Sequence, residues 1–205
     1  MPPGMKPINL NIVLAGVGGQ GTLVAGKLLG KLASRLGLDV KVSEVHGMSQ
    51  RGGSVVTYVR IGRQVFSPVV ETGTADFILA FEELEALRWA SLLRSGGILL
   101  VNTARTIPLP VAMGQASYPD QIAAELEAKA GKKAQVRAFD ALGLARQAGS
   151  VRAVNLVMLG ALSQFLDIPE TEFEQAIDES FAEKFRAVNH AAFRAGSAIM
   201  ETKRE

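Results

Sequence analysis

An apolar segment that leads directly into a cluster of glycines constrains the fold of this chain more than any other feature. Residues 8–15 are mostly apolar, and four of the next six residues are glycine, the last being Gly21. A helical pattern follows at once over residues 22–36, with an apolar side chain repeated at every fourth position from Val24. This order predicts a buried parallel strand that turns tightly into a helix. The bare amides at such a helix start favour an anion, because the helix dipole is positive there.

Strand-like and helix-like segments alternate along the rest of the chain until about residue 139. Segments rich in β-branched and apolar residues predict strands over residues 40–45, 54–61, 76–81, 98–102 and 134–139. Helical patterns cover residues 82–93, closed by Gly96-Gly97, then 120–130, 142–148, 151–166, 170–177 and 181–200. A connection with three prolines over residues 103–119 is expected to be a long irregular connection or a lid. The prediction is an α/β fold in three layers: a Rossmann-like, mostly parallel sheet with a helical C-terminal end.

Length and composition set the outer limits of this prediction. The 205 residues suit one α/β domain, residues 1–205, and no linker divides them. Charged residues make up 20% and the net charge is +2, with Lys and Arg scattered, so no nucleic-acid partner is indicated. The first residues show no apolar leader pattern and no apolar run reaches membrane-spanning length. We therefore expect a cytoplasmic protein without a membrane partner.

The chain contains no cysteine and only two histidines. A disulfide, a thiol nucleophile and a cysteine-ligated zinc or iron–sulfur centre are therefore excluded for this chain. Two histidines are also too few for a histidine-rich metal site. If the protein works in a redox system, the metal centres are expected on another chain.

The glycine cluster matches the spacing of a dinucleotide-binding turn. Gly16, Gly18 and Gly21 follow the pattern G-x-G-x-x-G between a predicted strand and a predicted helix. Together with Gly19 and Gln20 they are candidate cofactor-binding residues. An alternative is that these glycines only permit close packing, since any tight strand-to-helix turn uses them. The sequence supports anion binding and close packing about equally, and it supports NAD as the particular anion less than either.

A polar loop between the second and third predicted strands forms a second candidate site. It contains a carboxylate, an imidazole, hydroxyls, an amide and a guanidinium between glycines, and we take as candidate cofactor-binding residues Glu44, His46, Ser49, Gln50, Arg51, Gly52 and Gly53. In a doubly wound sheet this loop would leave the carboxyl edge close to the glycine cluster. A guanidinium beside bare backbone amides can bind a phosphate or a carboxylate. Glu44 also stands roughly where a ribose-binding acid would. The alternative is a loop that docks against a neighbouring subunit.

Asn102 is a further candidate, because it lies at the carboxyl end of a predicted strand. Ligands of open α/β sheets bind at this edge. Asparagine is also an ordinary residue at the end of a strand, so the position does not separate a ligand contact from a structural role.

Two of these motifs together resemble a known family. The runs G-V-G-G-Q-G at 16–21 and S-E-V-H-G-M-S-Q-R-G-G-S-V at 43–55 resemble the gamma subunit of the 2-oxoacid:ferredoxin oxidoreductases. Within them, the H-G-M-x-Q-R-G-G segment resembles the beta subunit of the indolepyruvate branch. The resemblance continues through D-F-I-L-A-F-E at 76–82 and through Asn155, Lys184 and Asn189.

The resemblance implies a subunit of an enzyme that oxidatively decarboxylates a 2-oxoacid such as indolepyruvate, forms an acyl-CoA and reduces ferredoxin. Thiamine diphosphate, Mg²⁺ and the iron–sulfur clusters are then expected on a larger partner subunit, and the chain alone is expected to be inactive. Its expected roles are to complete the complex and to help bind CoA, with the glycine loop and Arg51 as candidates. In isolation we expect a dimer.

Two other functional classes remain open from the sequence. The first is a free-standing NAD- or FAD-dependent oxidoreductase, in which the glycine loop holds the pyrophosphate and Glu44 a ribose. The second is a non-catalytic interaction module that uses the fold only as a scaffold. Nucleotide binding by the isolated chain would distinguish the first class.

Overall fold

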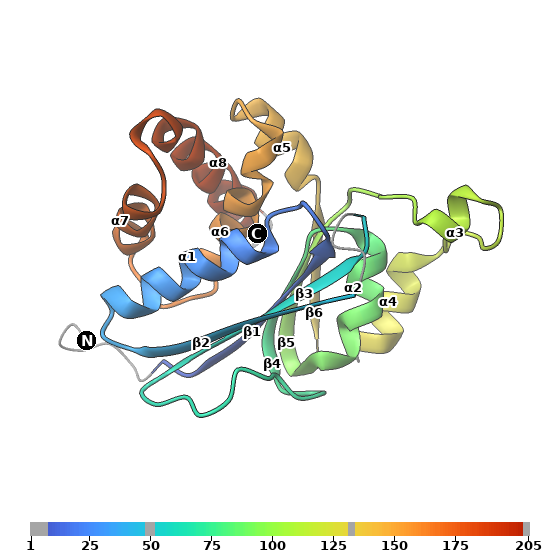
Figure 1. Cartoon of the computed structure of the whole chain (residues 1–205), viewed down its shortest axis with the longest axis horizontal. Helices are drawn as coiled ribbons and strands as arrows, with labels where there is room; N and C mark the ends of the chain where they lie inside the picture. The colour runs from blue at the N-terminus through green and yellow to red at the C-terminus, as the bar shows by residue number, and fades with distance from the viewer. Residues whose placement is uncertain (1–7, 48–51, 131–133, 203–205) are drawn as a thin grey trace.

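The fold is built on one six-stranded sheet, and the computed structural model describes residues 8–47, 52–130 and 134–202 (Figure 1). The order of strands across the sheet is β2-β3-β1-β4-β5-β6. Their bounds are β1 Leu10–Val17, β2 Asp39–His46, β3 Ser54–Gly62, β4 Ala75–Ala80, β5 Leu93–Asn102 and β6 Gln135–Phe139. Strands β1, β4, β5 and β6 pair in parallel, whereas β3 runs antiparallel to both β1 and β2. The sheet is therefore mixed.

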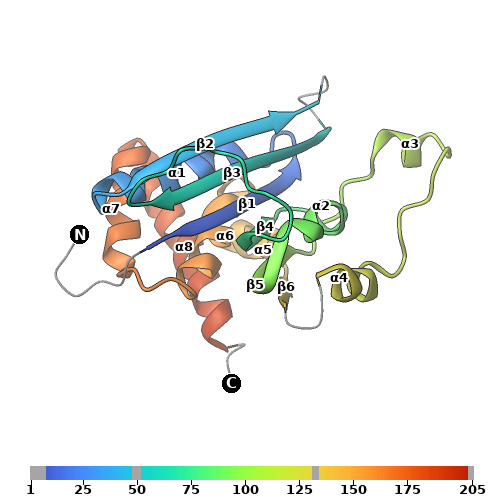
Figure 2. The same ribbon diagram turned by 90° about the horizontal axis from the view of Figure 1, so that it is seen from below.

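Helices cover both faces of the sheet, unequally (Figures 1 and 2). The larger group consists of α1 Thr22–Arg35, α5 Ala141–Gln147, α6 Val154–Ser163, α7 Glu170–Ser180 and α8 Glu183–Thr202. The smaller group, on the opposite face, consists of α2 Glu83–Trp89 and α4 Ile122–Ala130, with the short helix η1 Ala90–Leu92. Two further short helices are α3 Leu109–Ala112 and η2 Val151–Ala153. No helix in the described part of the chain is long and apolar enough to span a bilayer.

Alternation along β1 shows why one sheet supports two cores. Ile12 and Leu14 are buried against α1 and the C-terminal helices, whereas Val13 between them is buried against α2 and α4. Successive strand residues point to opposite faces, so a strand covered on both sides must be apolar throughout. The continuous apolar pattern over residues 8–15 is therefore explained, and the predicted three-layer α/β fold is confirmed.

The direction of the strands determines which loops meet. Strands β1, β2, β4, β5 and β6 all end at the same edge of the sheet, because β3 is antiparallel to its two neighbours. The connections that leave this edge include residues 18–21, 47–53 and 103–121. The glycine loop and the second candidate loop are therefore neighbours, as the sequence predicted.

Two local predictions require correction. Gly96 and Gly97 do not close a helix: they lie inside β5, which already begins at Leu93. Gly96 has a φ of +76°, a left-handed conformation that favours glycine, and the pairing of β4 with β5 shifts its register between Ala75 and Phe77. The connection 103–119 is irregular except for α3, but it extends away from the sheet rather than covering the glycine loop as a lid (Figure 2).

Candidate functional site

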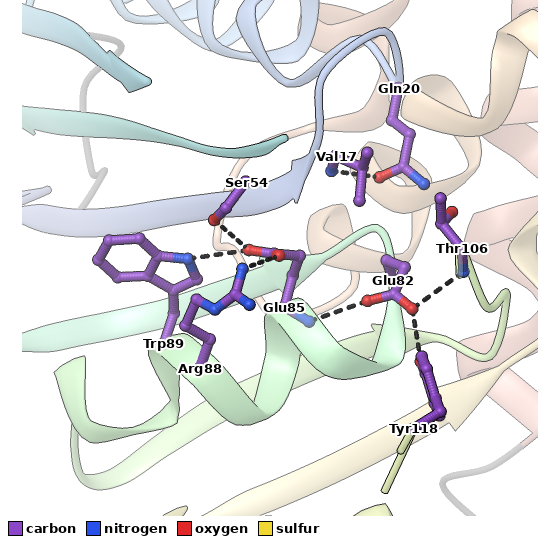
Figure 3. A network of polar contacts seen from close by, with 9 residues as sticks. All are labelled: Val17, Gln20, Ser54, Glu82, Glu85, Arg88, Trp89, Thr106 and Tyr118. Atoms are coloured by element: carbon purple, nitrogen blue, oxygen red, sulfur yellow. Dashed lines mark hydrogen bonds and ion pairs between the residues drawn. The ribbon is translucent and has the colours of Figure 1, made fainter. Parts of the chain in front are cut away.

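The glycine loop has a conformation that depends on its particular residues. Gly19 and Gly21 have φ values of +104° and +84°, where other residues are strained. A Cβ on Gly16 would lie 2.8 Å from Gln20 Oε1 and 3.0 Å from Thr22 Cγ2. The Gln20 side chain folds back instead of pointing outward: its Oε1 accepts a hydrogen bond from the Val17 N–H at 2.8 Å (Figure 3). Gln20, predicted as a cofactor contact, thus also holds the loop closed.

The start of α1 resembles an anion-binding helix terminus. Its N-cap is Gly21, no side chain of the described residues caps it, and its first turn contains no acidic residue. The amides of the first turn of a helix have no partner within the helix, and the dipole places partial positive charge on them. Among the described residues these amides have no side-chain partner, and anion binding there stays a prediction.

A pocket of about 620 Å³ lies between the glycine loop, η2 and α8. Cofactor and substrate pockets commonly have volumes in this range. Arg152 is the only charged side chain among the described residues that line it, and Val24, Val151 and Phe185 form an apolar part of its wall. Asn189 also lines it; this side chain is buried and makes no hydrogen bond within the described part of the chain. Its amide is therefore available for a hydrogen bond to a ligand in the pocket.

A second hollow of about 380 Å³ lies on the other side of the glycine loop. It brings Glu44 and His46, at the end of β2, next to Gly18, Gly19 and the first turn of α1. Glu44 is half-buried and His46 is exposed, with its Nδ1 3.0 Å from the Gly47 carbonyl oxygen. The described residues of the two predicted loops therefore line one hollow, and its use as a binding site stays a prediction.

A backbone hydrogen bond joins the two loops directly. The Gly18 N–H donates to the Gly53 carbonyl oxygen at 2.9 Å. Gly52 has a φ of +73°, a conformation that favours glycine, and no described atom lies within 4 Å of the place where a Cβ would be; a cofactor contact by Gly52 stays a prediction. Ser49, Gln50 and Arg51 lie outside the described residues, and their proposed roles stay predictions.

Glu44 does not stand where a dinucleotide-binding enzyme places its ribose-binding acid. In the common dinucleotide-binding order that acid follows the strand adjacent to the first strand. Here β3 lies between β1 and β2, so Glu44 is separated from β1 by a full strand. This topology disfavours the NAD interpretation, and a role for Glu44 in binding another ligand stays a prediction.

Asn102 lines the 620 Å³ pocket, but its side chain also has clear structural partners. Its Nδ2 donates to the Phe81 carbonyl oxygen at 2.9 Å, and its Oδ1 accepts from the amides of Ala141 and Leu142 at 3.1 and 3.3 Å. The side chain therefore joins β5 to the end of β4 and to the start of α5. A ligand contact by Asn102 stays a prediction.

Two buried carboxylates at the start of α2 organise the neighbouring loops (Figure 3). Glu82 accepts from the Glu85 amide at 3.0 Å, from the Thr106 amide at 3.1 Å and from the Tyr118 hydroxyl at 2.5 Å. Glu85 accepts from the Ser54 hydroxyl at 2.5 Å and from the Trp89 indole at 3.1 Å. Glu82 thus holds the connection after β5, and Glu85 holds the start of β3.

Burial raises the pKa of Glu85 above its ordinary value, and the hydrogen bond from Ser54 and the charge of Arg88 oppose this only in part. A carboxyl group with a raised folded-state pKa contributes stability below the unfolded pKa and loses it as pH rises through the folded pKa. We expect Glu85→Gln to remove this dependence. Urea unfolding at several pH values from 4 to 7 measures the free energy of unfolding of both proteins. The difference in favour of wild type should be largest at the acidic end of this range. A difference independent of pH would contradict the assignment.

Arg152 and Asn189 were not proposed as site residues from the sequence. Arg152 belongs to a short helix between α5 and α6, and Asn189 lies on α8; both reach the glycine loop only through tertiary packing. Asn155 lies against Gly21, where a Cβ would be 3.2 Å from its Nδ2. In the sequence, only the family resemblance, which includes Asn155, pointed to this residue.

Comparison with known proteins identifies the class to which this fold and this site belong. A model of the pyruvate ferredoxin/flavodoxin oxidoreductase family matches residues 11–199, and the chain belongs to that family. Within it, the chain is 46% identical over 190 residues to indolepyruvate oxidoreductase subunit IorB of Thermococcus kodakarensis, covering 91% of this chain and 93% of that protein. The resemblance to 2-oxoacid:ferredoxin oxidoreductases noted in the sequence is thereby confirmed.

Two other proteins similar to this chain are much longer than it. Ketoisovalerate oxidoreductase subunit VorA of Methanothermobacter marburgensis is 30% identical over 185 residues, which are 88% of this chain and 34% of that protein. The structure of 2-oxoglutarate:ferredoxin oxidoreductase from Magnetococcus marinus, solved with 2-oxoglutarate, coenzyme A and succinyl-CoA bound, superimposes with a TM-score of 0.73 at 23% identity. The match covers 97% of this chain and 32% of that chain, and it shows the shared fold.

Proposed function

We propose that this chain is the small, cluster-free subunit of a cytoplasmic 2-oxoacid:ferredoxin oxidoreductase whose substrate is indolepyruvate or a similar aryl 2-oxoacid. The observation that carries the proposal is the 46% identity to an indolepyruvate oxidoreductase subunit over nearly the full length of both chains. In this proposal the whole chain, residues 1–205, acts as one domain of the complex.

The residues of this chain do not fit the redox cofactors that such a reaction requires. There is no cysteine to ligate an iron–sulfur cluster. The described residues also contain no group of three or more His, Asp or Glu side chains that could hold a metal ion. In this proposal thiamine diphosphate, Mg²⁺ and the clusters are held by a larger partner subunit, through which ferredoxin is reduced.

The 620 Å³ pocket does fit an anionic, partly apolar ligand such as CoA. Arg152 and the open start of α1 would hold phosphate groups, while Val151 and Phe185 would contact less polar parts. When bound, CoA supplies the thiol that accepts the acyl group. The role of this chain is then to bind and orient that ligand beside the partner subunit.

Coexpression with the cysteine-rich, thiamine-binding subunit from the same source tests the subunit assignment. We expect the two chains to co-purify and to reduce ferredoxin in the presence of indolepyruvate and CoA, while this chain alone shows no activity. Failure to co-purify, or a pair without activity towards any 2-oxoacid, would contradict the assignment.

CoA binding by the pocket is tested with Arg152→Ala in the assembled complex. Loss of one charge-assisted hydrogen bond to phosphate, about 1.5 kcal/mol, predicts that the KM for CoA rises roughly tenfold. Arg146→Ala is the matched control, because Arg146 is an exposed arginine on α5 that does not line the pocket. An unchanged KM for CoA in Arg152→Ala would assign CoA binding to the partner subunit alone.

A further inference from the structure

The connection between β5 and α4, residues 103–121, extends away from the body of the protein as an arm (Figures 1 and 2). Not one of its residues is buried, and α3 within it has no buried side chain. A long connection of this kind inside an α/β domain is uncommon and is usually functional. We call residues 103–121 the β5–α4 arm.

The tip of the arm is apolar and uncharged. Ile107, Leu109 and Met113 are 56%, 71% and 59% exposed, and they lie within seven residues of one another. Residues 107–117 contain no charged side chain, although charged residues make up 20% of the chain. Clustered exposed apolar side chains mark interaction surfaces. The absence of charge argues against nucleic acid or an anionic membrane, both of which bind through Lys and Arg.

The base of the arm, in contrast, is fixed. Glu82 accepts hydrogen bonds from both of its sides, from the Thr106 amide and from the Tyr118 hydroxyl. The Arg105 Nε donates to Glu83 Oε2 at 2.6 Å, and its guanidinium lies 5.3 Å from the centre of the Tyr118 ring. A fixed base reduces the conformational entropy that is lost when the tip binds. The arm is therefore organised to present its tip before any partner arrives.

The occupant is best identified from the relatives and from the position of the arm. In the VorA protein, the part that matches 88% of this chain is only 34% of the length, so there this unit is joined to a much larger body. The arm leaves the same sheet edge as the glycine loop, because both follow the carboxyl ends of parallel strands. A partner that binds the arm would thus be held beside the candidate site.

We propose that the β5–α4 arm is the docking element by which this chain binds the larger subunit of its oxidoreductase, with Leu109 and Met113 inserted into an apolar groove of that subunit. The inference rests on the proposed function, since it requires such a partner. Permanent interfaces are more apolar than transient ones, which agrees with a tip that carries no charge.

The test is co-purification of the coexpressed complex from a tag on the larger subunit. Leu109→Asp with Met113→Asp is expected to lower the amount of this chain that is retained by at least about tenfold, as for residues central to an interface. Phe66→Asp is the matched control. Phe66 is 86% exposed, but it follows the carboxyl end of β3, at the edge of the sheet opposite to the arm. Because none of the three side chains is buried, circular dichroism and the melting temperature should be unchanged.

The outcomes separate this inference from the proposed function. If wild type does not co-purify with the larger subunit, the proposed function fails. If wild type and the arm variant are both retained equally, the docking role fails while the subunit assignment stands. If the arm variant instead converts a dimer of the isolated chain into a monomer, as measured by sedimentation, the occupant is a second copy and the proposal is overturned.

Discussion

Gly160→Ala is expected to lower the free energy of unfolding by about 3 kcal/mol or more. Helices α6 and α8 are in backbone contact at this point: a Cβ on Gly160 would lie 1.9 Å from the Phe193 carbonyl oxygen, and one on Gly196 would lie 1.9 Å from the Val157 carbonyl oxygen. The methyl group cannot be accommodated by rotation of a side chain, because the atoms that it meets belong to the backbone. Urea unfolding of the purified variant measures the effect.

Gly30→Ala in α1 is the matched control for this prediction. It is also a glycine inside a helix, but its Cβ would meet only Val42 Cγ2, at an ordinary 3.7 Å. Alanine is favoured over glycine in helices by about 1 kcal/mol, so Gly30→Ala should stabilise the protein slightly. If Gly160→Ala did not destabilise the protein either, this result would contradict the backbone contact between α6 and α8.

Asn102→Leu is expected to cost on the order of 3 to 5 kcal/mol, because it leaves two buried backbone groups and one partly buried group without their partner. These groups are the Phe81 carbonyl oxygen and the amides of Ala141 and Leu142. Leucine has the same branching and the same number of side-chain heavy atoms as asparagine, but it is larger, so the comparison with a second buried asparagine is needed to separate hydrogen bonding from packing. Chemical denaturation gives the magnitude.

Asn189→Leu provides the comparison for Asn102→Leu. Asn189 is a buried asparagine that lines the same pocket, but its side chain makes no hydrogen bond within the described part of the chain. We expect its replacement to change stability by less than about 1 kcal/mol, since no backbone group loses a partner. Equal losses for the two variants would show that pocket polarity, and not the bonds of Asn102, determines stability.

The sequence predicts the elements of this fold better than the way they are paired. Periodicity alone located β1, α1 and the C-terminal helices, since each of them buries a continuous apolar face. The insertion of β3 between β1 and β2 was not predicted, because alternation of apolar residues fixes the faces of a strand but not its neighbours. That one pairing is also what separates Glu44 from a dinucleotide-type position.

The candidate site was predicted in part for the same physical reason. The glycine loop and residues 44–53 are local motifs, and the structure brings Glu44, His46 and Gly53 to the loop. Arg152 and Asn189 reach the pocket from helices more than 120 residues further along the chain. Contacts of that range depend on how helices pack over the sheet, and a single sequence carries no pattern for them.

The hydrogen bond from Gly18 to Gly53 has a consequence for how the site responds to binding. The glycine loop and the loop after β2 share this bond, so a ligand that orders one of them also restricts the other. Such an effect is reciprocal. If contact with the second loop changes the affinity of the first loop for its ligand by some factor, that ligand changes the affinity of the second loop for its contact by the same factor. If a partner contacts the second loop and an anion binds the first, we therefore expect the two binding events to be thermodynamically coupled.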